Sequence, residues 1–213
     1  MINEQYLHCC VSFPSNRNLI LLAIALAAAF HQITVAEAMR LVIQRVKSAS
    51  VTVEQKQVSA IGPGMLALVG LHLEDEDSDL QYCAKKLLAI KLWENQNGAP
   101  WRQHVKQKEF EILCVSQFTL YGTLSKKNQP DYKLSMKADQ AQRKYNQFLQ
   151  ILRDGYAKEK ISDGKFGEMM DVELINDGPV TLVIDSRDEM LKKQMSSMSL
   201  STDGEKNSSE VES

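Results

Sequence analysis

The stretch EILCVSQFTLYG, residues 111–122, decides the fold of this sequence, because it predicts a strand that must lie inside the molecule. Its β-branched and aromatic residues favour a strand, which Gly122 ends. Residues 112–115 are apolar without alternation, a pattern typical of a strand that is buried on both faces. Two hydroxyls and an amide follow directly after Val115. Each would cost about 1–3 kcal/mol if it were buried without a partner, so we expect these groups to bind something.

Side-chain alternation limits how these polar groups can be used. In a regular strand Ser116 and Phe118 point to one face, and Gln117 and Thr119 point to the other. A single pocket therefore cannot receive all three polar side chains. Either the strand ends near Ser116 and frees its backbone N–H groups, or both faces are functional. Hydroxyls that simply bond to the backbone within a strand are the third alternative.

Further strands and two helices surround this strand within residues 39–185. Runs rich in β-branched residues predict strands at 41–53, 57–73, 89–94, 169–175 and 180–186, with turns at 62–64 and 176–179. Apolar residues at helical spacing predict two helices, with Leu80, Cys83, Ala84, Leu87 and Leu88 on the first and Ala138, Ala141, Tyr145, Phe148, Leu149 and Leu152 on the second. We expect Ser78 and Gln81 to cap the first helix. The pattern predicts an α+β domain in which a curved, antiparallel-rich, barrel-like sheet carries two packed helices.

The two ends of the chain differ from this domain. Residues 1–38 contain a short apolar run at 18–30, which is below the roughly 20 residues of a membrane span but as long as the apolar core of a signal peptide. We interpret 1–38 as an N-terminal extension outside the fold, with an export signal or a membrane anchor as the alternatives. Residues 186–213 are rich in Ser, Lys and Glu and have no aromatic residue, which predicts a disordered tail.

Composition excludes several classes of protein. The 213 residues carry a net charge of −2, which argues against a protein that binds polyanions over its whole surface. The four cysteines, Cys9, Cys10, Cys83 and Cys114, form no CxxC pair and have no histidine at ligand spacing. We therefore expect no metal and no cofactor. Cys83 on a helix stripe and Cys114 in the strand predict buried, reduced thiols, as in a reducing compartment such as the cytoplasm.

The motifs of common hydrolases and nucleotide enzymes are missing from the sequence. It has no G-x-S-x-G elbow, no Walker loop and no H-E-x-x-H zinc motif. A Ser-His-Asp site around Ser116 with His72 or His104 stays open, because the spacing of these residues neither supports nor excludes it.

The motif VSQFTL at residues 115–120 occurs together with NDGPVT at 176–181. This pair resembles the signature of the D-aminoacyl-tRNA deacylases, esterases that free tRNA from D-amino acids. Three more segments stand in the family's order and spacing, namely QRVKSASVTV at 44–53, NQPDY at 128–132 and DGKFGEMM at 163–170. The sequence is identified as a member of the eukaryotic-like, Gly-cisPro type of this family. The resemblance begins at Met39, where most members begin, and ends at about residue 184.

The resemblance implies a homodimer whose active sites lie where the two subunits meet. Residues 116–119 of one subunit would face Gly178 and Pro179 of the other, with the proline peptide in the cis form. Gln117, Gly178 and Pro179 are then expected to bind the substrate. The rigid backbone beside Gly178 and Pro179 would occupy the space that an L side chain needs, so that only D-amino acids fit.

The resemblance also implies the chemistry. An aminoacyl ester is already activated, so its hydrolysis needs little more than an oxyanion site and an oriented water. The Ser116 hydroxyl and the backbone N–H groups of Phe118 and Thr119 are expected to hold the acyl carbonyl, while the ribose 2′-hydroxyl of the tRNA orients the water. These three are the predicted catalytic residues. Thr119 is expected to position the substrate rather than attack it, because no base is evident to activate it.

The implied function is hydrolysis of the ester bond of D-aminoacyl-tRNA, and of mischarged glycyl-tRNA, at the 3′ acceptor end. L-aminoacyl-tRNA would be rejected, which makes this a cytoplasmic step of translation quality control without a membrane partner. The alternative is a catalytically weak nucleic-acid-binding protein on the same fold. RNA contact is expected between Thr123 and Lys165, where ten basic residues stand against five acidic ones. Glu168 departs from the Ala of many family members and puts a carboxylate near this region.

Overall fold

The computed structural model of the protein describes residues 38–187. In chain order the elements are β1 (Arg40–Val53), β2 (Lys56–Ile61), β3 (Gly64–Gly70), α2 (Asp77–Ala89), β4 (Lys91–Trp93), β5 (Gln103–His104), α3 (Val105–Lys108), β6 (Glu111–Ser116), η1 (Phe118–Tyr121), β7 (Thr123–Leu124), β8 (Pro130–Asp131), α4 (Ala138–Gly155), η2 (Lys158–Lys160), β9 (Ile161–Asp163) and β10 (Asp171–Asp185). The predicted extension at 1–38 and the predicted tail at 186–213 lie outside the described residues, apart from Ala38, Ser186 and Arg187. Within the described range no helix is long and apolar enough to cross a membrane.

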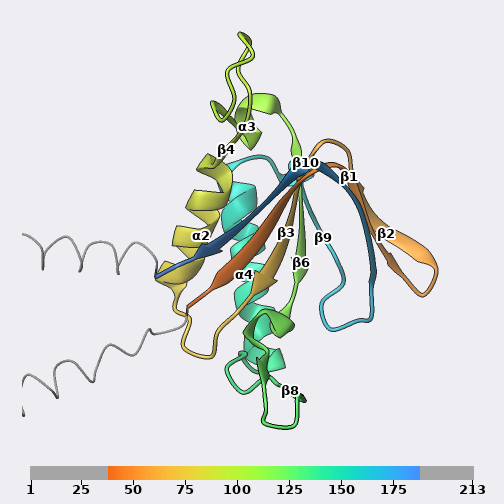
Figure 1. Ribbon diagram of the computed structural model, residues 1–213, viewed down its shortest axis with the longest axis vertical. Coiled ribbons are helices and arrows are strands. Elements are labelled where there is room, and N and C mark those ends of the chain that lie inside the picture. Colours follow the sequence, from red (N-terminus) through yellow and green to blue (C-terminus); the bar gives the residue numbers. More distant parts are fainter. Residues whose placement is uncertain (1–37, 188–213) are drawn as a thin grey trace, which may run out of the picture. The chain divides into compact units, whose positions relative to one another are not determined.

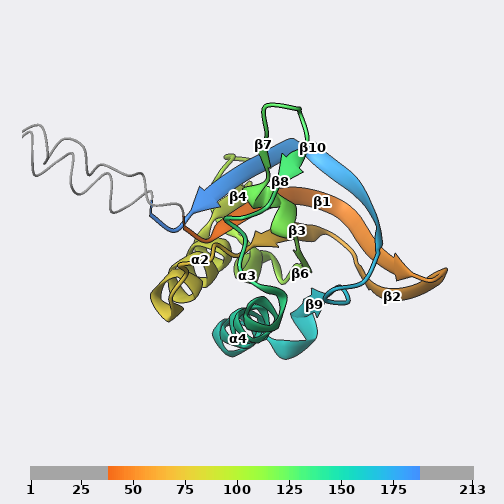
Figure 2. The same ribbon diagram turned by 90° about the horizontal axis from the view of Figure 1, so that it is seen from below.

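One six-stranded sheet organises the domain, with strands in the order β10-β1-β3-β6-β9 and β2 beside β1. β1 is antiparallel to β10, β2 and β3, whereas β6 lies parallel to both β3 and β9. Figures 1 and 2 show a strongly curved sheet with α2 and α4 against it. The α+β class and the curved, nearly barrel-shaped sheet are confirmed. The sheet is mixed, because two crossover connections through these helices bring in β6 and β9 as parallel strands.

β6 lies between two cores, one on each face of the sheet. Ile112 and Cys114 belong to the core under the helices, and Leu113 and Val115 belong to a second core that includes the end of β1. All four side chains are at most 1% exposed. The predicted burial of this strand on both faces is confirmed, and the end of the strand is thereby held in place from two sides.

β1 serves both cores because an irregularity reverses its side-chain alternation. Leu41 and Ile43 face the helices, whereas Val51, which is also odd-numbered, faces the second core. The register of β1 against β10 shifts between Val46 and Ser48. An extra residue in a strand moves every later side chain to the other face and bends the strand, which curls the sheet over its second core.

Both predicted helices are present, and their apolar stripes are buried except for Ala138 at the start of α4. α2 begins earlier than predicted, after Glu76. The Asp79 carboxylate accepts the N–H of Glu76 at 2.9 Å. The predicted cap by Ser78 and Gln81 is therefore wrong, since acidic residues in the first turn satisfy the free N–H groups and suit the positive end of the helix dipole.

Residues 171–185 form one continuous strand where the sequence predicts two strands and a turn. Against β1, Asn176 pairs with Val46 and Thr181 pairs with Gln44, so that residues 177–180 stand opposite Arg45 alone. The Gly and Pro that favour a hairpin turn here form a bulge instead, and strand pairing resumes beyond it. The predicted turn at 176–179 is therefore wrong, although the segment does leave the ladder.

Candidate active site

β6 ends at Ser116, and the chain turns immediately into η1. Ser116 is the last residue that pairs with β3, opposite Val69. The N–H of Gln117 still donates to the Val69 carbonyl at 2.8 Å, and Phe118 then begins the helical turn. The prediction of a strand up to Tyr121 is wrong, and the alternative that the strand ends near Ser116 is confirmed.

The turn leaves polar groups available at this junction. The first N–H groups of a helical turn, here those of Phe118 and Thr119, have no acceptor within the turn itself. The hydroxyl of Ser116 has no hydrogen-bond partner among residues 38–187. Ser135 holds the turn in place, because its hydroxyl donates to the Phe118 carbonyl at 2.8 Å. Three hydrogen-bond donors are therefore close together in the chain and not committed elsewhere.

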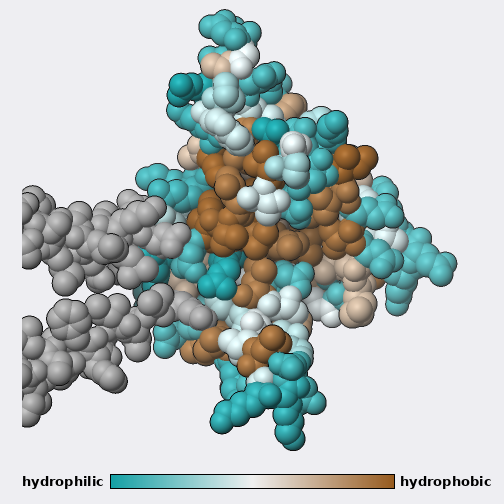
Figure 3. Space-filling model, viewed as in Figure 1, coloured by the Kyte–Doolittle hydropathy of each residue, from teal (hydrophilic) through white to brown (hydrophobic). Residues whose placement is uncertain are grey.

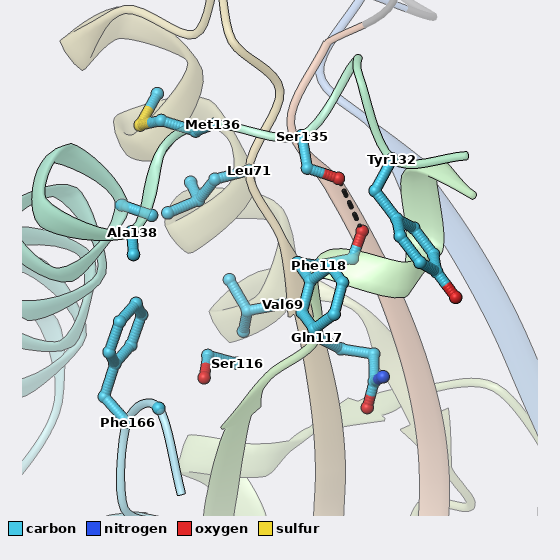
Figure 4. Close-up of a pocket in the computed structure, with 12 residues that line it drawn as sticks. Val69, Leu71, Ser116, Gln117, Phe118, Tyr132, Ser135, Met136, Ala138 and Phe166 are labelled. Carbon is cyan, nitrogen blue, oxygen red and sulfur yellow. Dashed lines mark hydrogen bonds between the residues drawn. The ribbon is translucent and has the colours of Figure 1, made fainter. Parts of the chain in front are cut away.

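A pocket of about 400 Å³ lies beside this junction. Figure 4 shows Ser116, Gln117 and Phe118 at its edge, with Phe166 and Ala138 on the side of α4. The lining is Val69, Leu71, Ser116, Gln117, Phe118, Tyr132, Ser135, Met136, Ala138, Ala141, Phe166 and Gly167. None of these residues is charged. The pocket suits a flat, apolar group next to neutral hydrogen-bond donors.

Aromatic residues from distant segments form the wall of the pocket, and the sequence analysis did not select them. Phe118 and Tyr132 pack edge to face with ring centroids 4.9 Å apart. Phe166 enters from the other side and leans on Tyr145 of α4, at 5.8 Å between centroids. Tyr132 and Phe166 do stand in the motifs NQPDY and DGKFGEMM, which carried the family resemblance. That resemblance was the only signal in the sequence for their role.

Gln117 and Thr119 interact with each other rather than with the pocket. The Gln117 side-chain amide donates to the Thr119 hydroxyl oxygen. Gln117 still lines the pocket, whereas Thr119 is exposed and does not. This arrangement leaves the Thr119 backbone, rather than its side chain, as the group nearest to the site.

The histidines of a Ser-His-Asp site lie elsewhere. His72 is buried against Tyr121, with ring centroids 5.3 Å apart. His104 caps α3, where its Nδ1 accepts the N–H of Gln107 at 3.3 Å. Neither ring is among the residues that line the pocket at Ser116, so the geometry does not form a triad there.

Gly178 and Pro179 lie away from the Ser116 pocket of their own chain, exposed on the edge strand β10. Their peptide bond is cis. Arg45 fixes the start of this bulge, because its Nε lies 2.9 Å from the Asp177 carboxylate while its guanidinium also donates to the Leu92 carbonyl. The structure thus brings Ser116, Gln117 and Phe118 together and keeps Gly178 and Pro179 apart from them.

Metal-ligating and nucleophilic side chains do not gather at this site. No group of three or more His, Cys, Asp or Glu residues suited to a metal ion occurs within the part of the chain that the structure describes. Cys83 and Cys114 are buried and free, as predicted, whereas Cys9 and Cys10 lie outside the described residues. Burial raises the pKa of the Cys114 thiol to about 12, so it stays protonated and unreactive.

The basic segment between Thr123 and Lys165 is less positive in space than in sequence. Four of its basic residues form ion pairs within the chain, namely Lys133 with Asp131, Lys144 with Asp77, Arg153 with Asp163 and Lys165 with Glu168. Lys126 and Lys127, between β7 and β8, have no ion-pair partner within residues 38–187. This hairpin connects Phe118 to Tyr132, so its two lysines lie close to the pocket in the chain.

Comparison with known proteins gives consistent results. The family model described as D-Tyr-tRNA(Tyr) deacylase matches residues 42–185. A D-aminoacyl-tRNA deacylase of Drosophila melanogaster is 50% identical over 151 residues, which are 71% of this chain and 94% of that protein. D-aminoacyl-tRNA deacylase 1 of Homo sapiens is 48% identical over 148 residues, 70% of each chain.

Solved structures agree with these relatives. One described as "c-Myc DNA Unwinding Element Binding Protein" has a TM-score of 0.66 and 47% identity, over 68% of this chain and 97% of that chain. A probable eukaryotic D-amino acid tRNA deacylase has a TM-score of 0.59 at 20% identity, over 69% and 98% of the two chains, and shares the fold. The match to the family model, which spans most of the chain, and the identity to curated members show that this protein belongs to the D-Tyr-tRNA(Tyr) deacylase family.

Proposed function

We propose that this protein hydrolyses the ester bond of D-aminoacyl-tRNA, and of mischarged glycyl-tRNA, releasing free tRNA and the amino acid in the cytoplasm. Membership of the family supports this activity. The observation that carries it is the end of β6, where Ser116 and the first N–H groups of η1 stand free beside an apolar pocket. The site needs neither a metal nor a cofactor.

The donors at this junction suit an oxyanion site. When water attacks an ester carbonyl, negative charge develops on the carbonyl oxygen, and fixed N–H and O–H donors stabilise that charge. The Ser116 hydroxyl and the backbone N–H groups of Phe118 and Thr119 would act together in this role. Thr119 contributes its backbone, since its side chain accepts a hydrogen bond from Gln117. A ribose 2′-hydroxyl of the substrate would orient the water.

The pocket suits the terminal adenosine of tRNA. Phe118, Tyr132 and Phe166 offer aromatic surfaces, and the remaining lining is mostly aliphatic. Stacking of a base on an aromatic ring contributes about 1–3 kcal/mol to binding. An adenine held there would bring its ribose and the ester toward Ser116 at the edge of the pocket.

We propose a homodimer that completes this site. Gly178 and Pro179 are exposed on β10 and do not line the pocket of their own chain. The same strand exposes Ile175, Leu182 and Val183 at 59%, 39% and 59%, and Figure 3 shows apolar residues gathered over the sheet. A second copy would cover these side chains and bring its own Gly178 and Pro179 to the Ser116 pocket, where they would exclude an L side chain.

Hydrolysis of D-Tyr-tRNA, L-Tyr-tRNA and Gly-tRNA by the full chain tests the activity. We expect D-Tyr-tRNA and Gly-tRNA to be deacylated at least about 100-fold faster than L-Tyr-tRNA, because a rigid wall excludes a side chain of the wrong hand far more strongly than a loose pocket does. Release of labelled amino acid measures the rates. Absent hydrolysis, with tRNA binding retained, would favour the nucleic-acid-binding alternative, which the curated relatives do not support.

The hairpin lysines are expected to bind the tRNA backbone and not the ester. Replacing Lys126 and Lys127 together by serine should lower kcat/KM for D-Tyr-tRNA about tenfold and reduce its salt dependence, because two phosphate contacts are lost. The same change should leave hydrolysis of D-tyrosyl-adenosine unaffected. Lys158→Ser with Lys160→Ser is the matched control, since η2 lies beside the start of β6 rather than its end at Ser116. Equal losses on both substrates would contradict this assignment.

A further inference from the structure

Asp75 is a buried carboxylate that lacks a charged partner at one of its oxygens. It lies between β3 and α2 and is 5% exposed. Its Oδ2 accepts the backbone N–H of His72 at 2.7 Å, while its Oδ1 has no hydrogen-bond partner. A buried charge is costly unless it is paired and fully hydrogen-bonded. The Ser116 pocket does not include Asp75, so the proposed reaction does not account for it.

The charged and titratable groups around Asp75 already have partners of their own. On α2, Asp79 accepts the Ser186 hydroxyl at 2.6 Å. On β1 and β10, Arg40 pairs with Asp185 at 3.4 Å. The groups that act on Asp75 or on its neighbours Cys83 and Tyr121 are Met39, Arg40, His72, Asp79, Cys83, Tyr121, Asp185 and Arg187. Arg187 favours the charged form of Asp75 only weakly, as the last of several effects.

Met39 holds the position from which a cation would reach Asp75. Its backbone N–H faces the Asp75 carboxylate and favours the charged form. The residue is fully buried, and its carbonyl accepts the N–H of Ser186 at 3.0 Å. The Cys83 thiol donates to the same carbonyl. The backbone nitrogen of Met39 is therefore fixed beside the unpartnered oxygen.

We infer that Asp75 is a binding site for the α-ammonium group of a chain that begins at Met39. In the 213-residue chain a single neutral amide N–H stands there. In a chain whose first residue is Met39, three N–H donors and a positive charge would take its place. A charged donor forms a shorter and stronger hydrogen bond with a carboxylate than a neutral one does. The start of the chain thus decides whether Asp75 is paired.

The part of the chain that this comparison needs folds as a unit in relatives. A D-aminoacyl-tRNA deacylase of Dictyostelium discoideum is matched over its whole length by 71% of this chain. The solved relative at 47% identity is matched over 97% of its length by 68% of this chain, and it has the same fold. A chain that begins at Met39 keeps every described element of the sheet and both helices.

The two chains should respond oppositely to pH between 4 and 7. In the full chain, burial raises the pKa of Asp75 from 3.8 to about 7. A carboxyl whose pKa is higher in the folded state stabilises the fold below the unfolded pKa, and that stability is lost as the pH rises. The folding equilibrium constant of the full chain should therefore fall by more than about tenfold over this range, relative to the chain that begins at Met39.

Pairing with an ammonium reverses this dependence in the shorter chain. The pKa of Asp75 is lowered by the positive charge, and the pKa of the ammonium is raised above its ordinary value of about 7.7–8.0. Stability from the pair should then persist from pH 4 to 7 and be lost only as the pH rises above about 8. Urea unfolding of both chains at pH 4 to 9 measures the difference, because other carboxyl groups contribute equally to both. Parallel pH profiles would overturn the inference.

Substitution of Asp75 gives a second, independent readout. In the chain that begins at Met39, Asp75→Asn should lower the folding equilibrium constant at pH 7 more than about tenfold, because the ammonium loses its partner. In the full chain the same change should leave it equal or higher. A chain whose first residue is Ala38, with its ammonium about 3.8 Å further along the backbone, should behave like the full chain.

Asp79→Asn is the matched control, because Asp79 is bonded to Ser186 and Glu76 in a way that does not involve the chain start. It should have the same effect in both chains. Equal effects of Asp75→Asn in the two chains, or a chain starting at Ala38 that matches the one starting at Met39, would refute the assignment.

Discussion

Replacing Ser116 by alanine is expected to lower kcat for D-Tyr-tRNA by about 100- to 1000-fold, the loss typical of an oxyanion-site donor. Ser116 is held by the last pair of the β3–β6 ladder, and its hydroxyl has no partner among the described residues. It is therefore free to donate to the oxygen on which charge develops. Since that charge is absent in the bound ester, KM should change little. Single-turnover deacylation measures the chemical step directly.

Ser135→Ala is the matched control for this prediction. Ser135 lines the same pocket, but its hydroxyl already donates to the Phe118 carbonyl at 2.8 Å. Its loss should loosen η1 and lower kcat no more than about tenfold. Ser116→Ala should also leave the unfolding midpoint within about 0.5 kcal/mol of that of the unchanged protein. An unchanged kcat in a folded Ser116→Ala variant would remove Ser116 from the chemistry.

Replacing Gly64 by alanine should lower the free energy of unfolding by about 3–5 kcal/mol. Gly64 begins β3 and pairs with Glu111 at the start of β6. A Cβ at Gly64 would lie 2.0 Å from the Glu111 carbonyl oxygen and 2.9 Å from its carbon. These are backbone atoms of the neighbouring strand, so they cannot move aside without disturbing the ladder that leads to Ser116. Urea denaturation measures the change.

Gly62→Ala provides the comparison two residues earlier. A Cβ there would meet only the Glu111 carboxylate, a flexible side chain, at an ordinary distance of 3.6 Å. The Gly62 N–H donates to that carboxylate at 2.9 Å, and alanine keeps this bond. We expect a change within about 0.5 kcal/mol. Equal losses for the two substitutions would show that the close approach at Gly64 relaxes without cost.

Local patterns in the sequence predicted the buried elements correctly. Residues 112–115 are apolar on both strand faces and are buried on both faces. The stripes of α2 and α4 repeat at helical spacing and face the core. These predictions hold because burial depends on side-chain periodicity, which a short window of sequence contains. Both predictions at polar junctions, the strand through Tyr121 and the turn at 176–179, were wrong.

The strand through Tyr121 fails because its end depends on a neighbour. β3 provides carbonyls only as far as Val69, which accepts the N–H of Gln117. Beyond it, η1 packs on Gly70, where an added Cβ would lie 3.0 Å from Leu120 and 3.1 Å from Tyr121. The absent side chain of Gly70 thus makes room for the helical turn. Composition of residues 117–121 still favours a strand, so no local pattern shows this end.

The sequence by itself therefore determined the α+β class, the buried strand, the two helices and, through its motifs, the family of this protein. Only the tertiary structure decided where β6 ends, that residues 177–180 bulge from one strand, and that Tyr132 and Phe166 join Phe118 around one pocket. The physical reason is the same in each case. Burial follows from side chains a few residues apart, whereas the free polar groups and the pocket follow from pairing and packing between segments far apart in the chain.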